Sequence, residues 1–203
     1  MCLLLETIMV ADGVIRHPGF HRRRMQQSRL ECYGIGTDID LDQFIHVPSE
    51  ASRGVWRCRI LYGKEIESVE FVKYIPRVVQ SLKIVVDDHL DYHLKFADRS
   101  ALNQLFGKRG DCDDVIIAQK GKLTDTTIAN LVFWDGSKWF TPDTPLLPGT
   151  QRAWLLESGQ IVESEITLSN YRSFQKAGMI NTFNDLENMQ VIPIDRIIPP
   201  DQE

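Results

Sequence analysis

The alternation of hydrophobic and polar positions predicts short strands near the start of the chain. Strands are predicted at the mainly apolar segment Leu3–Val10 and at two segments rich in β-branched and aromatic residues, Val55–Tyr62 and Ser68–Tyr74. Gly63-Lys64 lies between the last two segments and indicates a hairpin turn, and Asp12-Gly13 indicates another turn after the first segment.

A helix is predicted from about Phe20 to Tyr33. Its first turn is basic, with His21 followed by three arginines. Gly34 and Gly36 come directly after it, as glycines commonly do at the carboxyl end of a helix.

Strands and helices are mixed without strict alternation in the rest of the chain. Strands are predicted at Leu82–Val86, Val115–Ala118, Leu131–Trp134 and Lys138–Thr141, and helices from about Asp98 to Gly107 and from about Gln151 to Ser158. This order favours an α+β fold over a doubly wound sheet. Pro76 and the polar residues after it form the best internal boundary. We therefore expect two lobes, residues 1–77 and 78–203.

Composition and charge exclude several classes of protein. The 203 residues are 43% hydrophobic and 25% charged, as in ordinary globular proteins, and a net charge of −5 gives no general reason to bind nucleic acid or anionic membranes. The four cysteines form no C-x-x-C pair, which argues against a zinc ribbon or a redox dithiol and fits a reducing compartment. With no export signal or spanning segment in view, we expect a cytoplasmic protein without a metal site.

Four features could carry chemistry. Lys95 lies among apolar neighbours, where lost solvation would make its amine a better nucleophile. Asp125 lies in a polar segment before a strand and could pair with a protonated ring nitrogen. Gly149 precedes a helix whose first amides suit a phosphate, and Arg24 could clamp that phosphate. Each feature alone also has an ordinary explanation: a solvated lysine, a self-satisfied turn, an empty helix cap and a solvated basic face.

Taken together and in this order, the motifs resemble the class IV pyridoxal-phosphate enzymes of the D-amino-acid and branched-chain type, which include aminotransferases and aminodeoxychorismate lyases. The matched segments span nearly the whole chain: Leu5-Glu6-Thr7-Ile8, His21-x-x-Arg24-Met25, Leu94-Lys95-x-x-Asp98-Arg99, Asp114–Ile117, Gly121–Asp125 with Asn130, Thr141-Pro142, Leu147–Arg152, and Asn181 through Val191-Ile-Pro193. The resemblance implies the two-lobed fold of the D-amino-acid aminotransferase type, fold type IV, with the cofactor in the larger lobe.

The resemblance also implies the residue roles. Lys95 would hold the pyridoxal 5′-phosphate and move the substrate proton, and Asp125 would stand beside the ring nitrogen. The phosphate would be bound by Arg24, by the backbone amides of Thr150 and Gln151, and by the hydroxyl of Thr126 or Thr127. The arginines that could bind a substrate carboxylate are Arg57, Arg59, Arg99 and Arg152.

Two departures from the family pattern bear on activity. Asp125 stands where the family has a glutamate and is one methylene, about 1.5 Å, shorter. The Glu6-Thr7-Ile8 match also begins closer to the start of the chain than in most members, as in compact lyase domains fused to aminodeoxychorismate synthases.

Three functions remain open on the resemblance. The preferred one is a lyase that converts 4-amino-4-deoxychorismate to 4-aminobenzoate, a folate precursor, and pyruvate. The second is an aminotransferase of amino acids, and the third is a cofactor-binding homologue with weakened catalysis. In each case the family implies a homodimer acting on a small amino substrate. His89 and His93 are expected to lie in an exposed acidic loop, and Asp111–Asp114 to form a solvated entry to a strand.

Overall fold

The computed structural model describes residues 2–201 and divides into two compact units. Unit 1 consists of Met1–Pro76 and Leu94–Asp98, and unit 2 consists of Arg77–His93 and Arg99–Glu203. The division after Pro76 lies one residue from the boundary expected from the sequence. The segment Leu94–Asp98, however, groups with unit 1 and not with the larger lobe.

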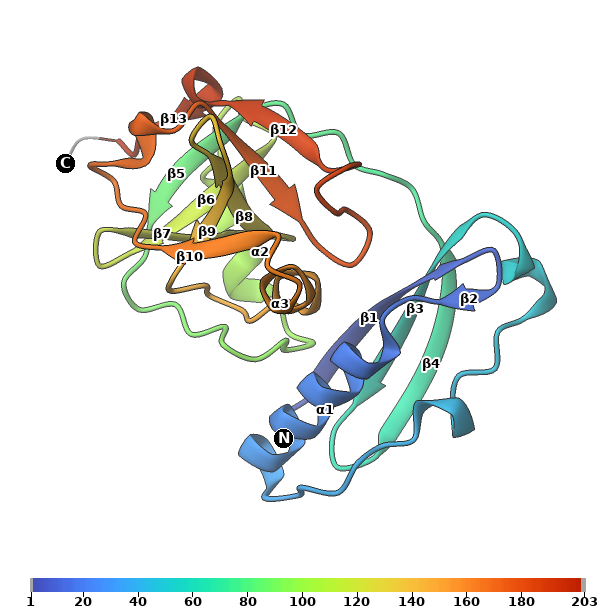
Figure 1. The fold of residues 1–203 in the computed structure, drawn as a ribbon. Coiled ribbons are helices and arrows are strands. Elements are labelled where there is room, and N and C mark those ends of the chain that lie inside the picture. Colours follow the sequence, from blue (N-terminus) through green and yellow to red (C-terminus); the bar gives the residue numbers. More distant parts are fainter. Residues whose placement is uncertain (1, 202–203) are drawn as a thin grey trace. The chain divides into compact units, whose positions relative to one another are not determined.

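Unit 1 is an antiparallel sheet with one long helix (Figure 1). Its strand order is β2-β1-β3-β4, where β1 is Leu4–Ala11, β2 is Val14–Ile15, β3 is Val55–Tyr62 and β4 is Ile66–Lys73. The helix α1 spans Pro18–Tyr33 and ends at Gly34, whose φ of 70° favours glycine. Two short 3-10 turns follow, Leu41–Gln43 and Ser49–Ser52.

The core of unit 1 lies between α1 and the sheet. Met25 of α1 packs with residues from β1 and β3, including Leu4, Ile8, Ile60 and Tyr62, all of them fully buried. Because alternate positions of β3 are buried, the period-two pattern of its sequence corresponds to one face on the core.

The segment Leu94–Asp98 joins unit 1 through the backbone of the first strand. The N–H of Leu5 donates to the carbonyl of Lys95 at 2.9 Å, and the N–H of Ala97 donates to the carbonyl of Leu3 at 2.9 Å. The start of β1 lies beyond the short strand β2, which pairs only with Val10 and Ala11, so this edge is open to the incoming segment. Unit 1 therefore holds Lys95 although the chain reaches it after entering unit 2.

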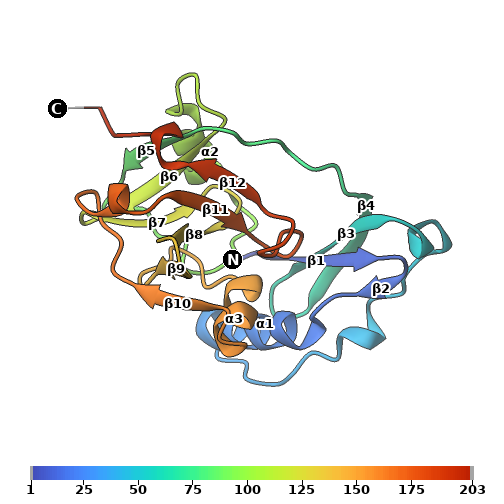
Figure 2. The same cartoon turned by 45° about the horizontal axis from the view of Figure 1, so that its top comes forward.

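Unit 2 is built around a mixed nine-stranded sheet (Figures 1 and 2). Seven strands follow the order β10-β9-β8-β7-β6-β5-β13, and β11 pairs with β8 and β12. Their bounds are β5 Leu82–Val86, β6 Asp114–Gln119, β7 Lys122–Thr126, β8 Asn130–Trp134, β9 Trp139–Pro142, β10 Ile161–Ser164, β11 Lys176–Ile180, β12 Gln190–Pro193 and β13 Ile197–Ile198. The helices are α2, Ser100–Gly107, and α3, Thr150–Glu157, with short 3-10 turns at Tyr171–Ser173 and Ile194–Arg196.

The unit 2 core and its mixed topology confirm the predicted α+β class. β5 pairs parallel with β6 and β13, and β9 with β10, while the remaining pairs are antiparallel. Buried side chains from many of these strands form the main cluster, among them Leu82, Ile116, Leu123, Phe133 and Ile192.

Two local predictions were wrong. The segment after Gly121 is not only a turn, because Lys122–Thr126 forms strand β7 with Asp125 buried in it. Asp114 is not solvated either: it begins β6 and is fully buried. Polar residues in sequence indicate a turn or a solvated strand entry, but here Asp114 and Asp125 have buried hydrogen-bond partners within the sheet.

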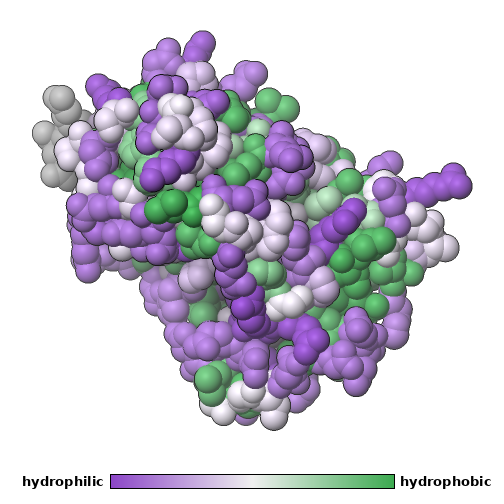
Figure 3. Space-filling model, viewed as in Figure 1, coloured by the Kyte–Doolittle hydropathy of each residue, from purple (hydrophilic) through white to green (hydrophobic). Residues whose placement is uncertain are grey.

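One face of the molecule is drawn in Figure 3 by the hydropathy of its residues. On the face drawn in Figure 3, hydrophilic residues predominate and are interrupted by smaller hydrophobic areas. Within residues 2–201, no helix combines the length and the hydrophobicity that a membrane span requires.

Candidate active site

Lys95 is held by the edge of the sheet in unit 1. Its carbonyl accepts the N–H of Leu5, and the neighbouring Phe96 forms a bridge with Leu4. The preceding Leu94 is buried in the unit 1 core, whereas Lys95 itself is half-buried. The backbone of this lysine is therefore positioned by strand pairing, while its side chain retains access to solvent.

A buried carboxylate cluster lies in the same unit. Glu6 is fully buried on β1 and accepts hydrogen bonds from the N–H of Thr7 at 2.9 Å, from Nδ1 of His21 at 3.0 Å and from Nε of Arg24 at 3.0 Å. Nη2 of Arg24 also donates to Glu6, so the arginine contacts both carboxylate oxygens. His21 and Arg24 come from the first turns of α1, which this pairing ties to β1.

The charges of this cluster follow from burial and pairing. Burial is the largest influence on Glu6 and raises its pKa, but the charges and hydrogen bonds of Arg24 and His21 outweigh it and hold the pKa well below its usual range. The pKa of His21 is lowered, mainly by burial, despite the opposing attraction of Glu6. Because an ionised carboxylate can only accept, Nδ1 of His21 is the donor in its hydrogen bond to Glu6.

Asp125 is the buried carboxyl group of unit 2. It is 4% exposed and accepts hydrogen bonds from Nδ2 of Asn130 and from the N–H of Leu147, both at 2.8 Å. Burial raises the pKa of Asp125 to about 7, because these two neutral donors and the charge of Arg152 only partly compensate for the loss of water. Near neutral pH this carboxyl group can gain or lose a proton, which is a common property of functional sites.

Asn130 links Asp125 to the loop before α3. Its Nδ2 also donates to the carbonyl of Leu147 at 2.8 Å. A Cβ atom added at Gly149 would lie 1.8 Å from Oδ1 of Asn130. This contact accounts for the glycine, because its φ of −70° suits any residue and Asn130 alone excludes a side chain there.

The first turn of α3 presents backbone amides. Thr150 and Gln151 begin the helix and are buried, and no side chain caps this end through a hydrogen bond. The first helical bond of the turn runs from the N–H of Ala153 to the carbonyl of Gly149. Amides that precede this bond have no acceptor within the helix, and together they form a site suited to an anion.

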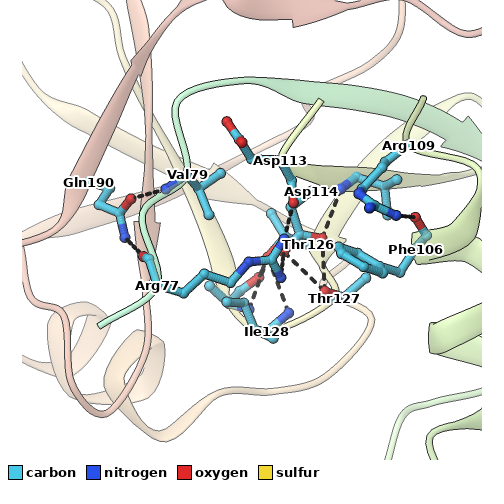
Figure 4. Close-up of polar contacts among 12 residues, drawn as sticks. Arg77, Val79, Phe106, Arg109, Asp113, Asp114, Thr126, Thr127, Ile128 and Gln190 are labelled. Atoms are coloured by element: carbon cyan, nitrogen blue, oxygen red, sulfur yellow. Dashed lines mark hydrogen bonds and ion pairs between the residues drawn. The ribbon is translucent and has the colours of Figure 1, made fainter. Parts of the chain in front are cut away.

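The two threonines after Asp125 stabilise the loop that carries them. Oγ1 of Thr127 donates to Asp114 at 2.8 Å, and Nη1 of Arg77 reaches the same carboxylate at 3.3 Å (Figure 4). Oγ1 of Thr126 donates to the carbonyl of Ala129 at 3.2 Å. Both hydroxyl protons are thus used within unit 2, which favours a supporting role for these side chains.

The four arginines proposed for substrate binding lie in different surroundings. Arg152 is buried and donates to the carbonyl of Pro142 at 2.9 Å and to Glu163 at 2.6 Å. Nη2 of Arg99 donates to the carbonyl of Thr127 at 2.7 Å. On unit 1, Arg57 stacks over Tyr74, and Arg59 pairs with the exposed Glu70. Only Arg99 contacts the loop that follows Asp125.

Sequence reasoning gave no separate role to Glu6, His21 and Asn130. A signal for Glu6 was present, because it is the only charged residue in the mainly apolar strand Leu3–Val10 and precedes a helix that begins with basic residues. Asn130 gave no comparable signal, since an asparagine before a strand is common in turns.

Comparison with known proteins shows which family this chain resembles. The sequence pattern of the family Amino-transferase class IV matches residues 93–197. A protein of Haemophilus influenzae without an assigned function is 38% identical over 185 residues, which is 90% of this chain and 98% of that protein. The crystal structure of a candidate 4-amino-4-deoxychorismate lyase from Haemophilus somnus 129PT is 35% identical with a TM-score of 0.86, covering 92% of this chain and 98% of the other.

More distant structures share the fold. A hypothetical aminotransferase of Mycobacterium tuberculosis, solved in a form with bound pyridoxal phosphate, has a TM-score of 0.75 at 15% identity and covers 98% of this chain and 84% of that chain. The predicted fold type is confirmed by these similarities. The chain belongs to amino-transferase class IV, a family of pyridoxal-phosphate-dependent enzymes.

Proposed function

We propose that this protein is a pyridoxal-phosphate-dependent lyase that converts 4-amino-4-deoxychorismate to 4-aminobenzoate and pyruvate. The observation that carries the proposal is the likeness to the Haemophilus somnus candidate lyase, which extends over nearly the whole of both chains at 35% identity. The match of the class IV pattern alone fits lyases and aminotransferases equally.

The residues present suit the cofactor. Asp125 is a buried carboxyl group with neutral hydrogen-bond donors, so a cation beside it would offset the cost of its ionisation. The protonated pyridine nitrogen of the cofactor is such a cation. The amides at the start of α3 are donors for a phosphate, and Lys95 offers a primary amine to an aldehyde.

Each residue has one task in the proposed reaction. Lys95 holds the cofactor and transfers the proton of the carbon that bears the substrate amine. Asp125 keeps the ring nitrogen protonated. Arg24 and the amides of Thr150 and Gln151 bind the phosphate. When bound, pyridoxal phosphate supplies an electron sink for the electron pair left by the departing proton.

The remaining candidates have narrower roles. Thr126 and Thr127 hold the loop through their contacts with Ala129 and Asp114. Arg99 is the preferred ligand for a substrate carboxylate because its guanidinium lies at this same loop. Arg152 is assigned a structural role, since Pro142 and Glu163 engage it inside unit 2.

The chemistry of the lyase is balanced without another reactant. The amino-bearing carbon of the substrate ring loses its proton, the carbon–oxygen bond to the enolpyruvyl group breaks, and that group takes up a proton to leave as pyruvate. The ring that remains is aromatic 4-aminobenzoate. Lys95 is the proton acceptor in this proposal.

The test is a product assay. The purified protein is loaded with pyridoxal phosphate and mixed with 4-amino-4-deoxychorismate, and 4-aminobenzoate and pyruvate are both measured. We expect the two products in equal amounts, and no turnover by Lys95→Ala. The exposed Lys64 of unit 1 provides the control, because Lys64→Ala should keep full activity. A loaded protein that forms neither product would refute the lyase.

The alternative is an aminotransferase, which the class IV match also supports. That enzyme would convert the bound cofactor to its amine form when given an amino acid, and a 2-oxo acid would restore it. Binding of the cofactor without either reaction would instead indicate a homologue with weakened catalysis, a possibility raised by Asp125 in place of the family glutamate.

The family also leads us to propose a homodimer that acts in the cytoplasm on a small amino substrate. Sedimentation of the loaded protein tests the oligomeric state, with a mass of twice 23.3 kDa as the expected result.

A further inference from the structure

We propose that Glu6 and His21 are positioning residues that orient the guanidinium of Arg24 for the phosphate of the cofactor. This inference rests on the proposed function, in which Arg24 binds that phosphate. Neither residue is placed in contact with substrate or cofactor, so both act through Arg24.

The contact between Glu6 and Arg24 determines how the guanidinium is turned. Arg24 uses Nε and Nη2, two donors on the same side of the planar group, and Glu6 receives them with its two oxygens. Such a two-point contact fixes the plane of the guanidinium as well as its position. The other terminal nitrogen, Nη1, is therefore directed away from Glu6.

The burial of this pair makes Glu6 an important counter-ion for the charge of Arg24. The side chain of Arg24 is 14% exposed and that of Glu6 is fully buried. A guanidinium withdrawn from water requires a charged or strongly hydrogen-bonding partner. Glu6 supplies one from the strand that also pairs with the backbone of Lys95, so one strand supports both Lys95 and Arg24.

His21 fixes the carboxylate itself. Its Nδ1 and the N–H of Thr7 donate to Oε1 of Glu6, at 3.0 and 2.9 Å. With the two donors of Arg24, the carboxylate has four hydrogen bonds and little freedom to rotate. His21 stands three residues before Arg24 on α1, so the helix brings both side chains to the same face.

A second ion pair of the same residue types in unit 1 shows what an unsupported pair looks like. Nη1 of Arg59 lies 3.5 Å from Glu70, and both side chains are exposed, at 43% and 59%. A pair of this kind contributes little and imposes no geometry. It serves as the matched control.

The experiment compares the affinity for pyridoxal phosphate with the affinity for pyridoxal, which has the aldehyde and ring but no phosphate. Dissociation constants are measured by absorbance titration, and circular dichroism confirms folding. The ratio of the dissociation constant of pyridoxal to that of pyridoxal phosphate isolates the contribution of the phosphate, and a larger ratio means a larger contribution. The variants are Arg24→Gln, Glu6→Gln, His21→Leu and His21→Asn, with Glu70→Gln as the control.

In the wild type we expect pyridoxal phosphate to bind more tightly than pyridoxal, and Arg24→Gln to remove most of that difference. Glu6→Gln should raise the dissociation constant of pyridoxal phosphate by about tenfold and that of pyridoxal by less than about twofold. His21→Leu should act in the same direction. His21→Asn should restore most of the ratio, because its amide nitrogen can replace Nδ1. Glu70→Gln should leave both constants unchanged.

The possible failures are distinct. If Arg24→Gln leaves the ratio unchanged, Arg24 does not bind the phosphate and the proposed function has failed at that residue. If Arg24→Gln lowers the ratio but Glu6→Gln leaves it unchanged, the positioning role is overturned. This holds whether Glu6→Gln weakens the binding of both ligands equally or changes the binding of neither. Should Glu6→Gln not fold, the comparison of His21→Leu with His21→Asn gives the same decision.

Discussion

Glu6 and Asp125 are both buried carboxyl groups on strands, one in each unit, and their pKa values move in opposite directions. Glu6 has a guanidinium and an imidazole as partners, which hold its pKa well below the usual range. Asp125 has an amide side chain and a backbone N–H, and burial raises its pKa to about 7. Burial alone therefore does not determine the charge of a buried acid; the charge of its partners does.

This difference corresponds to two kinds of function. A carboxylate that is ionised at every physiological pH can orient a neighbouring cation, as proposed for Glu6. A carboxyl group with neutral donors is suited to a cation supplied by a ligand, as proposed for Asp125. Four measurements on the cofactor-free protein test this difference between Glu6 and Asp125.

The largest expected effect is the pH dependence due to Asp125. Its pKa is raised from 3.8 to about 7 by folding, so the protonated form stabilises the folded state below pH 3.8 and that contribution is lost as the pH rises to about 7. The loss amounts to about 4 kcal/mol. The unfolding free energy measured by denaturant from pH 4 to 8 should show this slope in the wild type and not in Asp125→Asn.

The matched control for that slope is Asp195→Asn, a change at an exposed aspartate of unit 2. It should retain the wild-type slope. An Asp125→Asn protein with the same slope as the wild type would show that Asp125 is not the buried acid described here.

The second effect concerns Glu6. Glu6→Gln removes the fully buried carboxylate that pairs with the half-buried Arg24, and we expect a loss of about 3 kcal/mol in the unfolding free energy at pH 7. The pKa of Glu6 is lowered by folding, so its contribution is present above the unfolded value of 4.5 and disappears as the pH falls below it. The wild type and the variant should therefore converge in acid, opposite to the trend for Asp125; a constant difference at all pH values would contradict the ion pair.

The third effect tests whether the donors of Asp125 are rigidly placed. Gly149→Ala introduces a Cβ at 1.8 Å from Oδ1 of Asn130, and we expect the unfolding free energy to fall by about 2 kcal/mol. The same change in an Asn130→Ala background should cost much less, because the obstructing atom is gone. Equal costs in the two backgrounds would exclude Asn130 as the reason for the glycine.

The smallest effect comes from the exposed pair of Arg59 and Glu70. Because both side chains are solvated, Glu70→Gln should change the unfolding free energy by about 0.5 kcal/mol or less. Denaturant titration of Glu70→Gln and Glu6→Gln under the same conditions shows how much of the loss in Glu6→Gln is due to burial. If Glu70→Gln lost as much unfolding free energy as Glu6→Gln, burial could not explain the loss.

Most of the secondary structure could be predicted from local pattern. The strand Val55–Tyr62 and the end of the helix at Tyr33 were placed as observed, because alternation and terminal glycines act over a few residues. Asp114 was expected in a solvated entry to a strand and Asp125 in a polar turn, and both are buried on strands instead. A polar residue becomes buried when distant segments supply its hydrogen bonds, and the partners Arg77 and Leu147 lie far from them in the chain.

The family could be identified from the sequence, because the order and spacing of the motifs are properties of the chain before it folds. The sequence also contains the chemical groups: an amine at Lys95, a carboxyl at Asp125 and a guanidinium at Arg24. The surroundings of these groups became known only from the folded chain. Folding brought Lys95 to the edge of β1 in unit 1, joined Arg24 to Glu6, and enclosed Asp125 with neutral donors. Charge and orientation depend on distances between residues far apart in the sequence, and these distances exist only in the folded chain.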